Sequence, residues 1–322
     1  MSDKIKLNLN GIQENVSLAP FTTFKIGGKA RYFLQAKTQD DVVGAIRAAR
    51  EARIPYLILG GGSNILVSDH GYQGLVIRIA NTVFEHLGDG RVRCGAGLAL
   101  SRLIYCAKEI NLGGIEYMAG IPGTVGGAVY GNAGAWGRGF GEVVKEAVVY
   151  RDDKVLTLTH DDLGFVYRGS AIKKNGGIIM EITIILVPED KKSIQEKTYE
   201  VIKKRNKAEV KEPSAGCVFK NIDLKKIQID KEKVMKALDL NEEEYGKATN
   251  HDKLPVGFII DRLGLKEKII GRAKISECHG AYIVNMGGAK AEDVVMLMSF
   301  IKTKVRNHLG IQLEEEVQLV GF

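Results

Sequence analysis

The chain has 322 residues, 45% of them hydrophobic, a length typical of two or three domains with cores of their own. Its 46 basic and 39 acidic residues give a formal net charge of +7, which is ordinary for a basic enzyme and favours anionic ligands. The four cysteines form no C-x-x-C pair, which argues against a zinc ribbon, a thioredoxin-like site and a disulfide scaffold.

The chain shows no targeting or membrane-spanning segment. The polar N-terminal stretch MSDKIKLNLNGIQENVSLAP has no apolar core, so we expect no signal peptide. The longest apolar run, 177–187, is interrupted by Glu181 and is shorter than the ~20 residues that a membrane span needs. We therefore predict a buried strand there, no membrane association, and a cytoplasmic protein whose free thiols suit a reducing compartment.

The first two thirds of the chain alternate between predicted strands and helices. Helical spacing of apolar residues predicts amphipathic helices over 40–54 and 99–111. Asp152-Asp153 is expected to join two of the strands as a hairpin. The predicted strands are 31–36, 56–59, 75–79, 145–151, 154–159 and the run that ends at Val187. Helices among mixed strands indicate an α+β domain.

A basic helix and a proline mark the next boundary. Ser193 followed by Glu196 fits a capping box and predicts a helix over 193–207, and Pro213 then breaks the chain, so we place a boundary near 210. A second α+β unit should follow. Its expected helices are 232–240, 255–265 and 291–310, and its expected strands are 272–277, 281–285 and 313–321.

The glycines suggest a phosphate site without the common nucleotide fingerprints. The chain has no G-x-G-x-x-G, no P-loop and no H-E-x-x-H, and its six histidines form no metal-ligand pattern, so no metal is expected. Three glycines in LGGGSN (59–64) follow a short strand and can turn successive N–H groups towards an anion. In AGIPGTVGGAVYGNAGA (119–135), a helix is expected to start after Thr124, and helix N-termini bind phosphate. Two such segments suggest a bound dinucleotide outside a Rossmann fold.

Seven motifs in order then make the chain resemble a known family. They are TFKIGGKA (23–30), LGGGSNILVSDHGYQGLVI (59–77), GIPGTVGGAVYGNAGAWG (120–137), YRGS (167–170), PSAGCVFKN (213–221), GLKEKIIGRAKISECHGAYIVN (264–285) and EEEVQLVG (314–321). Together they resemble the UDP-N-acetylenolpyruvoylglucosamine reductases, flavoenzymes of bacterial cell-wall synthesis. The short spacing between YRGS and PSAGC is similar to that of the family's shorter subtype.

The resemblance implies a fold and a cofactor. It implies an α+β architecture with a vanillyl-alcohol-oxidase (PCMH) type FAD-binding domain in two subdomains, 1–80 and 81–210, and a substrate-binding domain, 211–322. It implies non-covalent FAD. The residues it places on the cofactor are Leu59, Gly60, Gly61, Gly62, Ser63, Asn64, Gly120, Ile121, Pro122, Gly123, Gly126 and Gly127.

The resemblance also implies a reaction. NADPH would give a hydride to the flavin, which would pass it to the enolpyruvyl group of UDP-N-acetylglucosamine enolpyruvate and yield UDP-N-acetylmuramate. Arg168 would hold the carboxylate and stabilise the enolate-like charge, and Glu316 would complete the site. Asn221 and Lys266 would bind the UDP-sugar, although a surface role is the ordinary expectation for such a lysine.

Cys217 departs from the family pattern, which usually has a serine at the position of the proton donor. A thiol ordinarily has a pKa of ~8.5, so it is mostly protonated at neutral pH and is a much stronger acid than a hydroxyl. Cys217 is therefore predicted to donate the proton, with activity that falls at alkaline pH as the thiolate forms. Inert packing of Cys217, with water as the donor, is the alternative.

Three other functions compete with this one. A hydroxy-acid oxidase on the same FAD domain would leave Cys217 and Glu316 without a role. An FAD-carrying electron-transfer subunit would need a redox partner, and a basic nucleic-acid-binding protein would be colourless and salt-sensitive. We expect a monomeric enzyme that acts on a small molecule and binds no nucleic acid.

Overall fold

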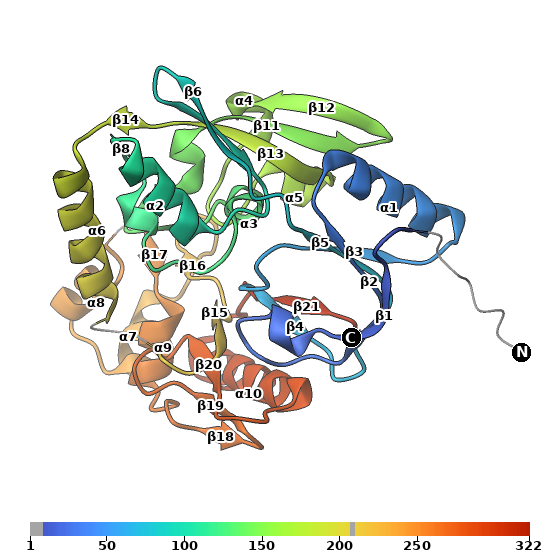
Figure 1. Ribbon diagram of the computed structural model, residues 1–322. Helices are drawn as coiled ribbons and strands as arrows, with labels where there is room; N and C mark the ends of the chain where they lie inside the picture. The colour runs from blue at the N-terminus through green and yellow to red at the C-terminus, as the bar shows by residue number, and fades with distance from the viewer. Residues whose placement is uncertain (1–8, 207–209, 251) are drawn as a thin grey trace, which may run out of the picture. The chain divides into compact units, whose positions relative to one another are not determined.

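The computed structural model describes residues 9–206, 210–250 and 252–322. The contacts divide the chain into two compact units, drawn in Figure 1. Unit 1 comprises residues 1–16, 30–61 and 73–207, and unit 2 comprises residues 17–29, 62–72 and 208–322. Two short segments from the first quarter of the sequence thus belong with the C-terminal third. The three-part division at 80 and 210 stays a prediction.

A four-stranded sheet in unit 1 has the order β1-β2-β5-β3, and β3 runs parallel to β5. Its elements are β1 (Gln13–Ser17), β2 (Lys29–Ala36), α1 (Gln39–Glu51), β3 (Tyr56–Leu59) and β5 (Tyr72–Ile79). Helix α1 begins at a capping box, in which Thr38 accepts a hydrogen bond from the N–H of Asp41. Its buried residues Val42, Ala45, Ile46 and Ala49 belong to one core with those of the sheet. The predicted strands 31–36, 56–59 and 75–79 and the predicted helix 40–54 are confirmed.

Unit 1 also contains a five-stranded antiparallel sheet, with the order β12-β11-β13-β7-β6. Its strands are β6 (Phe84–Gly88), β7 (Arg91–Gly95), β11 (Val144–Arg151), β12 (Lys154–Thr159) and β13 (Ile178–Ile185). Asp152 and Asp153 both have positive φ, 50° and 59°, as the tight turn of a two-residue hairpin requires. The predicted hairpin and the predicted buried strand are therefore confirmed.

Helices and short strand pairs complete unit 1. The helices are α2 (Leu100–Glu109), α3 (Val125–Gly131), α4 (His160–Leu163), α5 (Ala171–Asn175) and α6 (Lys191–Asn206), with short 3₁₀ helices at Glu116–Met118 and Phe140–Val143. The strand pairs are β8 (Leu112–Gly113) with β14 (Val187–Pro188), and β9 (Gly134–Ala135) with β10 (Arg138–Gly139).

The start of α6 differs from the sequence prediction. Asp190 Oδ1 accepts hydrogen bonds from the N–H groups of Lys192 (3.1 Å) and Ser193 (3.0 Å). The Ser193 hydroxyl instead donates to Glu189. The helix therefore begins at Lys191, before the capping box predicted at Ser193, because Asp190 rather than Ser193 caps its first N–H groups. The predicted last residue, Lys207, lies outside the described residues.

Unit 2 contains a four-stranded sheet of order β15-β20-β19-β18 with helices packed around it. Its strands and helices are β4 (Ile65–Val67), β15 (Ser214–Cys217), β16 (Ile222–Asp223), α7 (Lys231–Leu238), α8 (Glu242–Ala248), β17 (Lys253–Leu254), α9 (Val256–Arg262), β18 (Ile269–Ile270), β19 (Ala273–Ile275), β20 (Tyr282–Asn285), α10 (Ala291–Leu309) and β21 (Gln318–Val320), with a 3₁₀ helix at Ala19–Phe21. The predicted elements at 232–240, 255–265, 272–277, 281–285 and 291–310 are confirmed with shorter bounds. The strand predicted over 313–321 is only Gln318–Val320, which pairs in parallel with β4.

Polar side chains tie the early segments of unit 2 to its C-terminal part. Asp69 accepts hydrogen bonds from the N–H groups of Ala291 (3.0 Å) and Glu292 (3.2 Å), the first residues of α10. Asn285, only 5% exposed, accepts from Gly287 N–H (2.8 Å) and Ala289 N–H (3.0 Å) and donates to the Phe24 carbonyl (3.0 Å). The helix N-terminus is therefore capped by a residue distant in sequence, Asp69, and Asn285 ties the loop before the helix to Phe24.

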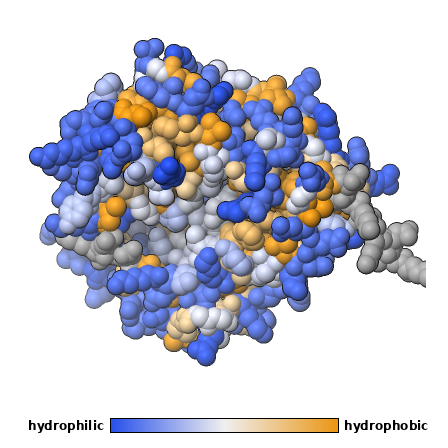
Figure 2. All heavy atoms as spheres, viewed as in Figure 1, coloured by the Kyte–Doolittle hydropathy of each residue, from blue (hydrophilic) through white to orange (hydrophobic). Residues whose placement is uncertain are grey.

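Hydrophilic residues predominate on the face drawn in Figure 2, where hydrophobic residues gather only in small groups. Within residues 9–206, 210–250 and 252–322, no helix is both long and apolar enough to span a membrane.

Replacing Asn285 by leucine should lower the free energy of unfolding by about 3 kcal/mol, because the buried Ala289 N–H and Phe24 carbonyl lose their partner and the part-buried bond to Gly287 N–H is also lost. Asn241→Ala is the control: Asn241 caps α8 at the surface by accepting from Glu244 N–H (2.9 Å), and its loss should cost about 1 kcal/mol. Urea denaturation of both variants would measure this. An Asn285→Leu loss no larger than that of Asn241→Ala would contradict the role assigned to Asn285.

Candidate active site

Two glycine segments of unit 1 touch backbone to backbone. A Cβ on Gly61 would lie 2.8 Å from Gly123 Cα, and a Cβ on Gly60 would lie 2.8 Å from Thr124 Oγ1. Real Cβ contacts are not this short, so side chains at these positions would force the segments apart. The LGGGSN turn and the start of α3, which the sequence suggested as two phosphate sites, therefore lie together.

The backbone N–H groups at this contact are available for an anion. Among the residues that the structure describes, none accepts a hydrogen bond from the N–H of Gly60, Gly61, Gly123 or Thr124. Successive unused N–H groups in a glycine turn form an anion-binding concavity. We define these four residues as the glycine cradle. It suits the pyrophosphate of a dinucleotide, because three of its four residues are glycines and its N–H groups have no acceptor among the described residues.

The N-terminus of α3 is a poor phosphate donor, although the helix begins after Thr124 as predicted. Val125 N–H donates to the Leu98 carbonyl (2.8 Å), Gly126 N–H to the Ala96 carbonyl (2.9 Å), and Gly127 N–H to the Thr124 hydroxyl (3.4 Å). A Cβ on Gly126 would lie 2.7 Å from Ala96 Cβ, so this glycine permits close packing. The assignments of Gly126 and Gly127 to the cofactor stay predictions.

The remaining predicted cofactor residues of unit 1 flank the cradle. Leu59 is the buried last residue of β3, and Ile121 N–H donates to the Met118 carbonyl (3.0 Å). Gly120 has φ +80°, and a Cβ there would lie 2.8 Å from the Arg205 side chain. Pro122 is exposed and precedes Gly123, whose φ is +128°. These values describe a turn that glycine favours.

The other half of the LGGGSN turn belongs to unit 2. Gly62 has φ +62°, and a Cβ there would lie 2.1 Å from the Phe21 carbonyl oxygen. Its own carbonyl accepts from Thr23 N–H (3.1 Å), and the Thr23 hydroxyl donates to the Ser214 carbonyl (2.7 Å). Thr23 thus joins the glycine turn to β15, while Ser63 lies partly exposed beside it.

Gly216 and Cys217 form a bulge in β15. Ser214 pairs with Val284 and Cys217 with Tyr282, so the strand holds one residue more than its partner between these pairs. Gly216 supplies the positive φ, +78°, that such a bulge favours. Bulges re-aim the residue that follows, which explains why a glycine precedes the half-buried Cys217.

Glu316 lies next to this bulge in unit 2. Its N–H donates to the Val218 carbonyl (2.9 Å), and its carbonyl accepts from Asn64 Nδ2 (3.1 Å). Phe219 and Glu315 form a β-bridge at the same place. The structure thus brings the backbones of Asn64, Cys217 and Glu316 together. Glu316 precedes β21 and is not part of the last strand as predicted.

The other cysteines have different surroundings. Burial raises the pKa of the Cys94 thiol to about 12, so this thiol stays protonated in the core of unit 1. Cys106 is half-buried in α2, and Cys278 is exposed. Only Cys217 follows a bulge beside other predicted site residues.

Arg168 stands at the tip of a tight turn in unit 1. Val166 and Gly169 exchange two backbone hydrogen bonds (3.0 and 3.2 Å). Arg168, the third residue of the turn, has φ +57°, where glycine or asparagine is usual. Such a conformation costs on the order of 1 kcal/mol in a larger residue and is common at functional sites. The guanidinium lies over the Tyr167 ring (5.3 Å) and donates to the Gly134 carbonyl (3.3 Å).

The predicted substrate residues Asn221 and Lys266 flank opposite ends of α9. Asn221 Oδ1 accepts from Val256 N–H (3.2 Å) at the first residue of that helix. Lys266 follows the helix, and its Nζ lies 2.7 Å from Asp261 Oδ1. Both side chains therefore have structural partners in unit 2. Their binding to a UDP-sugar stays a prediction.

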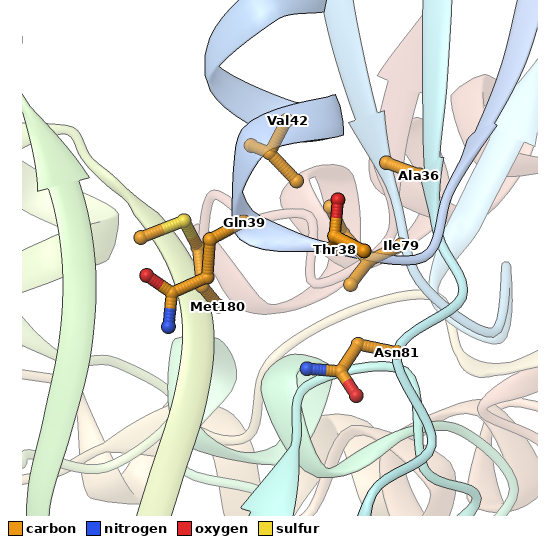
Figure 3. Close-up of a pocket in the computed structure, with 7 residues that line it drawn as sticks. All are labelled: Ala36, Thr38, Gln39, Val42, Ile79, Asn81 and Met180. Atoms are coloured by element: carbon orange, nitrogen blue, oxygen red, sulfur yellow. The ribbon is translucent and has the colours of Figure 1, made fainter.

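Figure 3 shows a small pocket of unit 1 away from the glycine cradle. Its walls come from the ends of β2 and β5, the start of α1 and Met180 of β13. Its lining residues leave no room even for a water molecule, whereas ordinary ligand sites enclose ~300 Å³ or more. We assign it no ligand. In the part of the chain that the structure describes, no group of three or more His, Cys, Asp and Glu residues could hold a metal.

Comparisons with known proteins give the family. The model of the UDP-N-acetylenolpyruvoylglucosamine reductase C-terminal domain matches residues 208–320, and that of an FAD binding domain matches residues 30–158. A UDP-N-acetylenolpyruvoylglucosamine reductase of Anoxybacillus flavithermus is 34% identical, over 98% of this chain and 97% of its own. The chain belongs to the UDP-N-acetylenolpyruvoylglucosamine reductase family. The Bacillus subtilis member is also 34% identical, over 95% of this chain and 93% of its own.

The solved structures agree with this membership. The crystal structure of the Thermus caldophilus reductase superposes with a TM-score of 0.74 and 31% identity, covering 95% of this chain and 97% of that one. An FAD-binding domain followed by the reductase C-terminal domain confirms the predicted fold class, and it confirms FAD as the expected cofactor. The glycine cradle fits that cofactor, since its four N–H groups have no acceptor among the described residues and three of its residues are glycines.

Sequence reasoning missed the residues that hold the site together. Thr23 and Thr124 lie inside recognised motifs, but no role was assigned to either. The Thr23 hydroxyl bonds to the carbonyls of Gly62 and Ser214, and the Thr124 hydroxyl accepts from Gly127 N–H. For Thr124 the local signal is its place directly after Gly123 at the start of a helix; Thr23 has no such local signal.

Gly61→Ala should sharply reduce the FAD that the purified protein carries, because the new Cβ would push Gly123 away and open the cradle. Gly44→Ala is the matched control. A Cβ on Gly44, in α1, meets nothing within 4 Å, so that variant should keep its FAD and gain about 0.5–1 kcal/mol of helix stability. Flavin absorbance per protein chain is the measurement. Equal FAD in both variants would rule out the cradle as the cofactor site.

Proposed function

We propose that this protein reduces UDP-N-acetylglucosamine enolpyruvate to UDP-N-acetylmuramate, using FAD and NADPH, in the synthesis of peptidoglycan precursors. Membership in the reductase family over nearly the whole chain carries the proposal. It favours this reaction over a hydroxy-acid oxidase, an electron-transfer subunit and a nucleic-acid-binding protein. A monomer in the cytoplasm stays our expectation.

The flavin, when bound, carries the hydride from NADPH to the substrate. The glycine cradle would hold its pyrophosphate by the backbone N–H groups of Gly60, Gly61, Gly123 and Thr124. Thr124 supports this arrangement because its hydroxyl lies against the position of a Gly60 Cβ. The chain's contribution here is orientation, which a rigid backbone contact supplies better than mobile side chains.

Arg168 is proposed to bind the substrate carboxylate. Hydride addition to the terminal carbon of the enol ether places negative charge beside that carboxylate. A guanidinium stabilises such charge through paired, charge-assisted hydrogen bonds. The positive φ of Arg168 supports this role, because strained backbone persists where function requires a fixed geometry.

Cys217 is proposed to protonate the carbon next to the carboxylate, which completes the reduction. The bulge at Gly216 and the neighbouring backbone of Glu316 support a fixed position for the thiol. Glu316 is proposed to complete the site, and Asn221 and Lys266 to bind the UDP-sugar. General acid catalysis of this kind typically contributes 10²–10⁴ in rate.

Mass spectrometry tests the proposed reaction. The protein, NADPH and UDP-N-acetylglucosamine enolpyruvate should together form a product heavier by two hydrogens, at a rate that depends on protein. Boiled protein is the control. Unchanged substrate with consumption of NADPH would point to another acceptor and overturn the proposal.

Cys217→Ser should remain active but lose the fall in rate at alkaline pH, because thiols in general lose their proton near pH ~8.5 and hydroxyls do not. Cys217→Ala should lose about 10²–10⁴ in the rate of substrate reduction. Rates from pH 6 to 10 for the three proteins, with Cys278→Ser as an exposed-thiol control, are the measurement. An alkaline limb that survives in Cys217→Ser would exclude the thiol as the titrating acid.

Arg168→Gly should separate stability from function. Glycine adopts the positive φ without strain, so the free energy of unfolding should change by less than about 1 kcal/mol. The rate of substrate reduction should fall by about 10²–10³, since a transition-state charge loses its partner. Thermal unfolding and single-turnover rates would be compared. A variant with both properties unchanged would remove Arg168 from the mechanism.

A further inference from the structure

Helix α3 connects the glycine cradle to the turn that carries Arg168, all within unit 1. Gly123 and Thr124 of the cradle directly precede its first residue, Val125. Asn132 follows its last residue, Gly131, in the left-handed conformation with φ 42°. Seven helical residues, a rise of roughly 10 Å, thus separate the two ends.

The Asn132 side chain makes two hydrogen bonds at that end of the helix. Its Nδ2 donates to the Val166 carbonyl (3.0 Å), in the first residue of the Arg168 turn. Its Oδ1 accepts from Gly141 N–H (3.0 Å). Asparagine tolerates the left-handed conformation, and only an amide offers one donor and one acceptor in this arrangement.

The Arg168 turn depends on such external support. Its third residue has an unfavourable φ, so local preferences alone do not hold it. Besides Asn132, the Ser170 hydroxyl donates to the Tyr130 carbonyl of α3 (2.9 Å), and Lys173 Nζ donates to the Arg168 carbonyl (3.1 Å). Two of these three contacts come from α3 and its cap, so α3 sets where the turn stands relative to the cradle.

We propose that Asn132 is a positioning residue for the reaction: its amide fixes the Arg168 turn to the helix that begins at the glycine cradle. The inference rests on the proposed function. In the proposed reaction, Asn132 keeps the Arg168 guanidinium at a constant distance from the cofactor site, so that the carboxylate of the substrate is held where reduction occurs. Asn132 itself touches no reacting atom.

Asn132→Asp tests the inference with little change in shape. The aspartate keeps an acceptor for Gly141 N–H and tolerates positive φ, but presents an oxygen to the Val166 carbonyl. Asn111→Asp is the matched control, because Asn111 also has positive φ (57°) just beyond the end of a helix, α2. Both variants place a negative charge at a helix C-terminus, and Asn132→Asp also loses the hydrogen bond to Val166, so its melting temperature should fall somewhat further than that of Asn111→Asp.

The measurements are FAD content, the rate of flavin reduction by NADPH, the rate of reoxidation by substrate, and substrate affinity by calorimetry. Asn132→Asp should lose about ten- to a hundredfold in the reoxidation rate, as displacement of a catalytic group by about 1 Å does. FAD content and reduction by NADPH should match those of Asn111→Asp. In an Arg168→Ala background, Asn132→Asp should cause no further loss, because it acts through the guanidinium.

Three results would overturn the inference. In the first, Asn132→Asp behaves as Asn111→Asp does. In the second, its loss in reoxidation rate persists in full in the Arg168→Ala background. In the third, its FAD content and its rate of reduction by NADPH fall to the same degree as its rate of reoxidation. Failure of the proposed function would look different. The unsubstituted protein itself would not be reoxidised by the substrate, and the inference would fall with it.

Discussion

Gly61 approaches Gly123 so closely that it has no room for a side chain: a Cβ on Gly61 would lie 2.8 Å from Gly123 Cα. The other features of unit 1 follow from this contact. It fixes the end of β3 against the start of α3, and it leaves the N–H groups of both segments facing no acceptor within the described part of the chain. Because α3 then runs from this point to Asn132, the contact also determines where the Arg168 turn can be held.

In unit 2, side-chain hydrogen bonds hold together segments that are far apart in the sequence. Its early segments, 17–29 and 62–72, must stay with a C-terminal part more than a hundred residues away. Thr23, Asp69 and Asn285 achieve this by bonding to backbone groups of β15, α10 and Phe24. The bulge at Gly216 and the stretch before β21 then meet through backbone hydrogen bonds, which brings Cys217 and Glu316 onto neighbouring segments.

Local patterns in the sequence predicted most helices and strands, because apolar periodicity and turn residues act over a few positions. The Asp152-Asp153 hairpin and the helix beginning after Thr124 are examples. Predictions failed where a nearby polar group competed. Asp190 caps α6, where Ser193 was expected to be the capping residue. The last strand was predicted over 313–321, but only Gln318–Val320 pairs with β4.

The site was predicted in outline, from motifs whose joint order indicates the family. What the sequence did not reveal are contacts between residues far apart, such as Asn132 with Val166 or Asp69 with α10. The sequence also did not reveal that the N–H groups of Val125 and Gly126 donate to the carbonyls of Leu98 and Ala96. No local pattern encodes which distant carbonyl a side chain or an amide will reach.

Anaerobic absorbance of the purified protein tests the central claim most directly. NADPH should bleach a bound-flavin spectrum, and UDP-N-acetylglucosamine enolpyruvate should then restore it without oxygen. That result would place the cofactor and both substrates on this chain. A flavin that stays reduced after the addition would contradict the proposed acceptor, and a colourless protein that takes up no FAD would contradict the account of the glycine cradle.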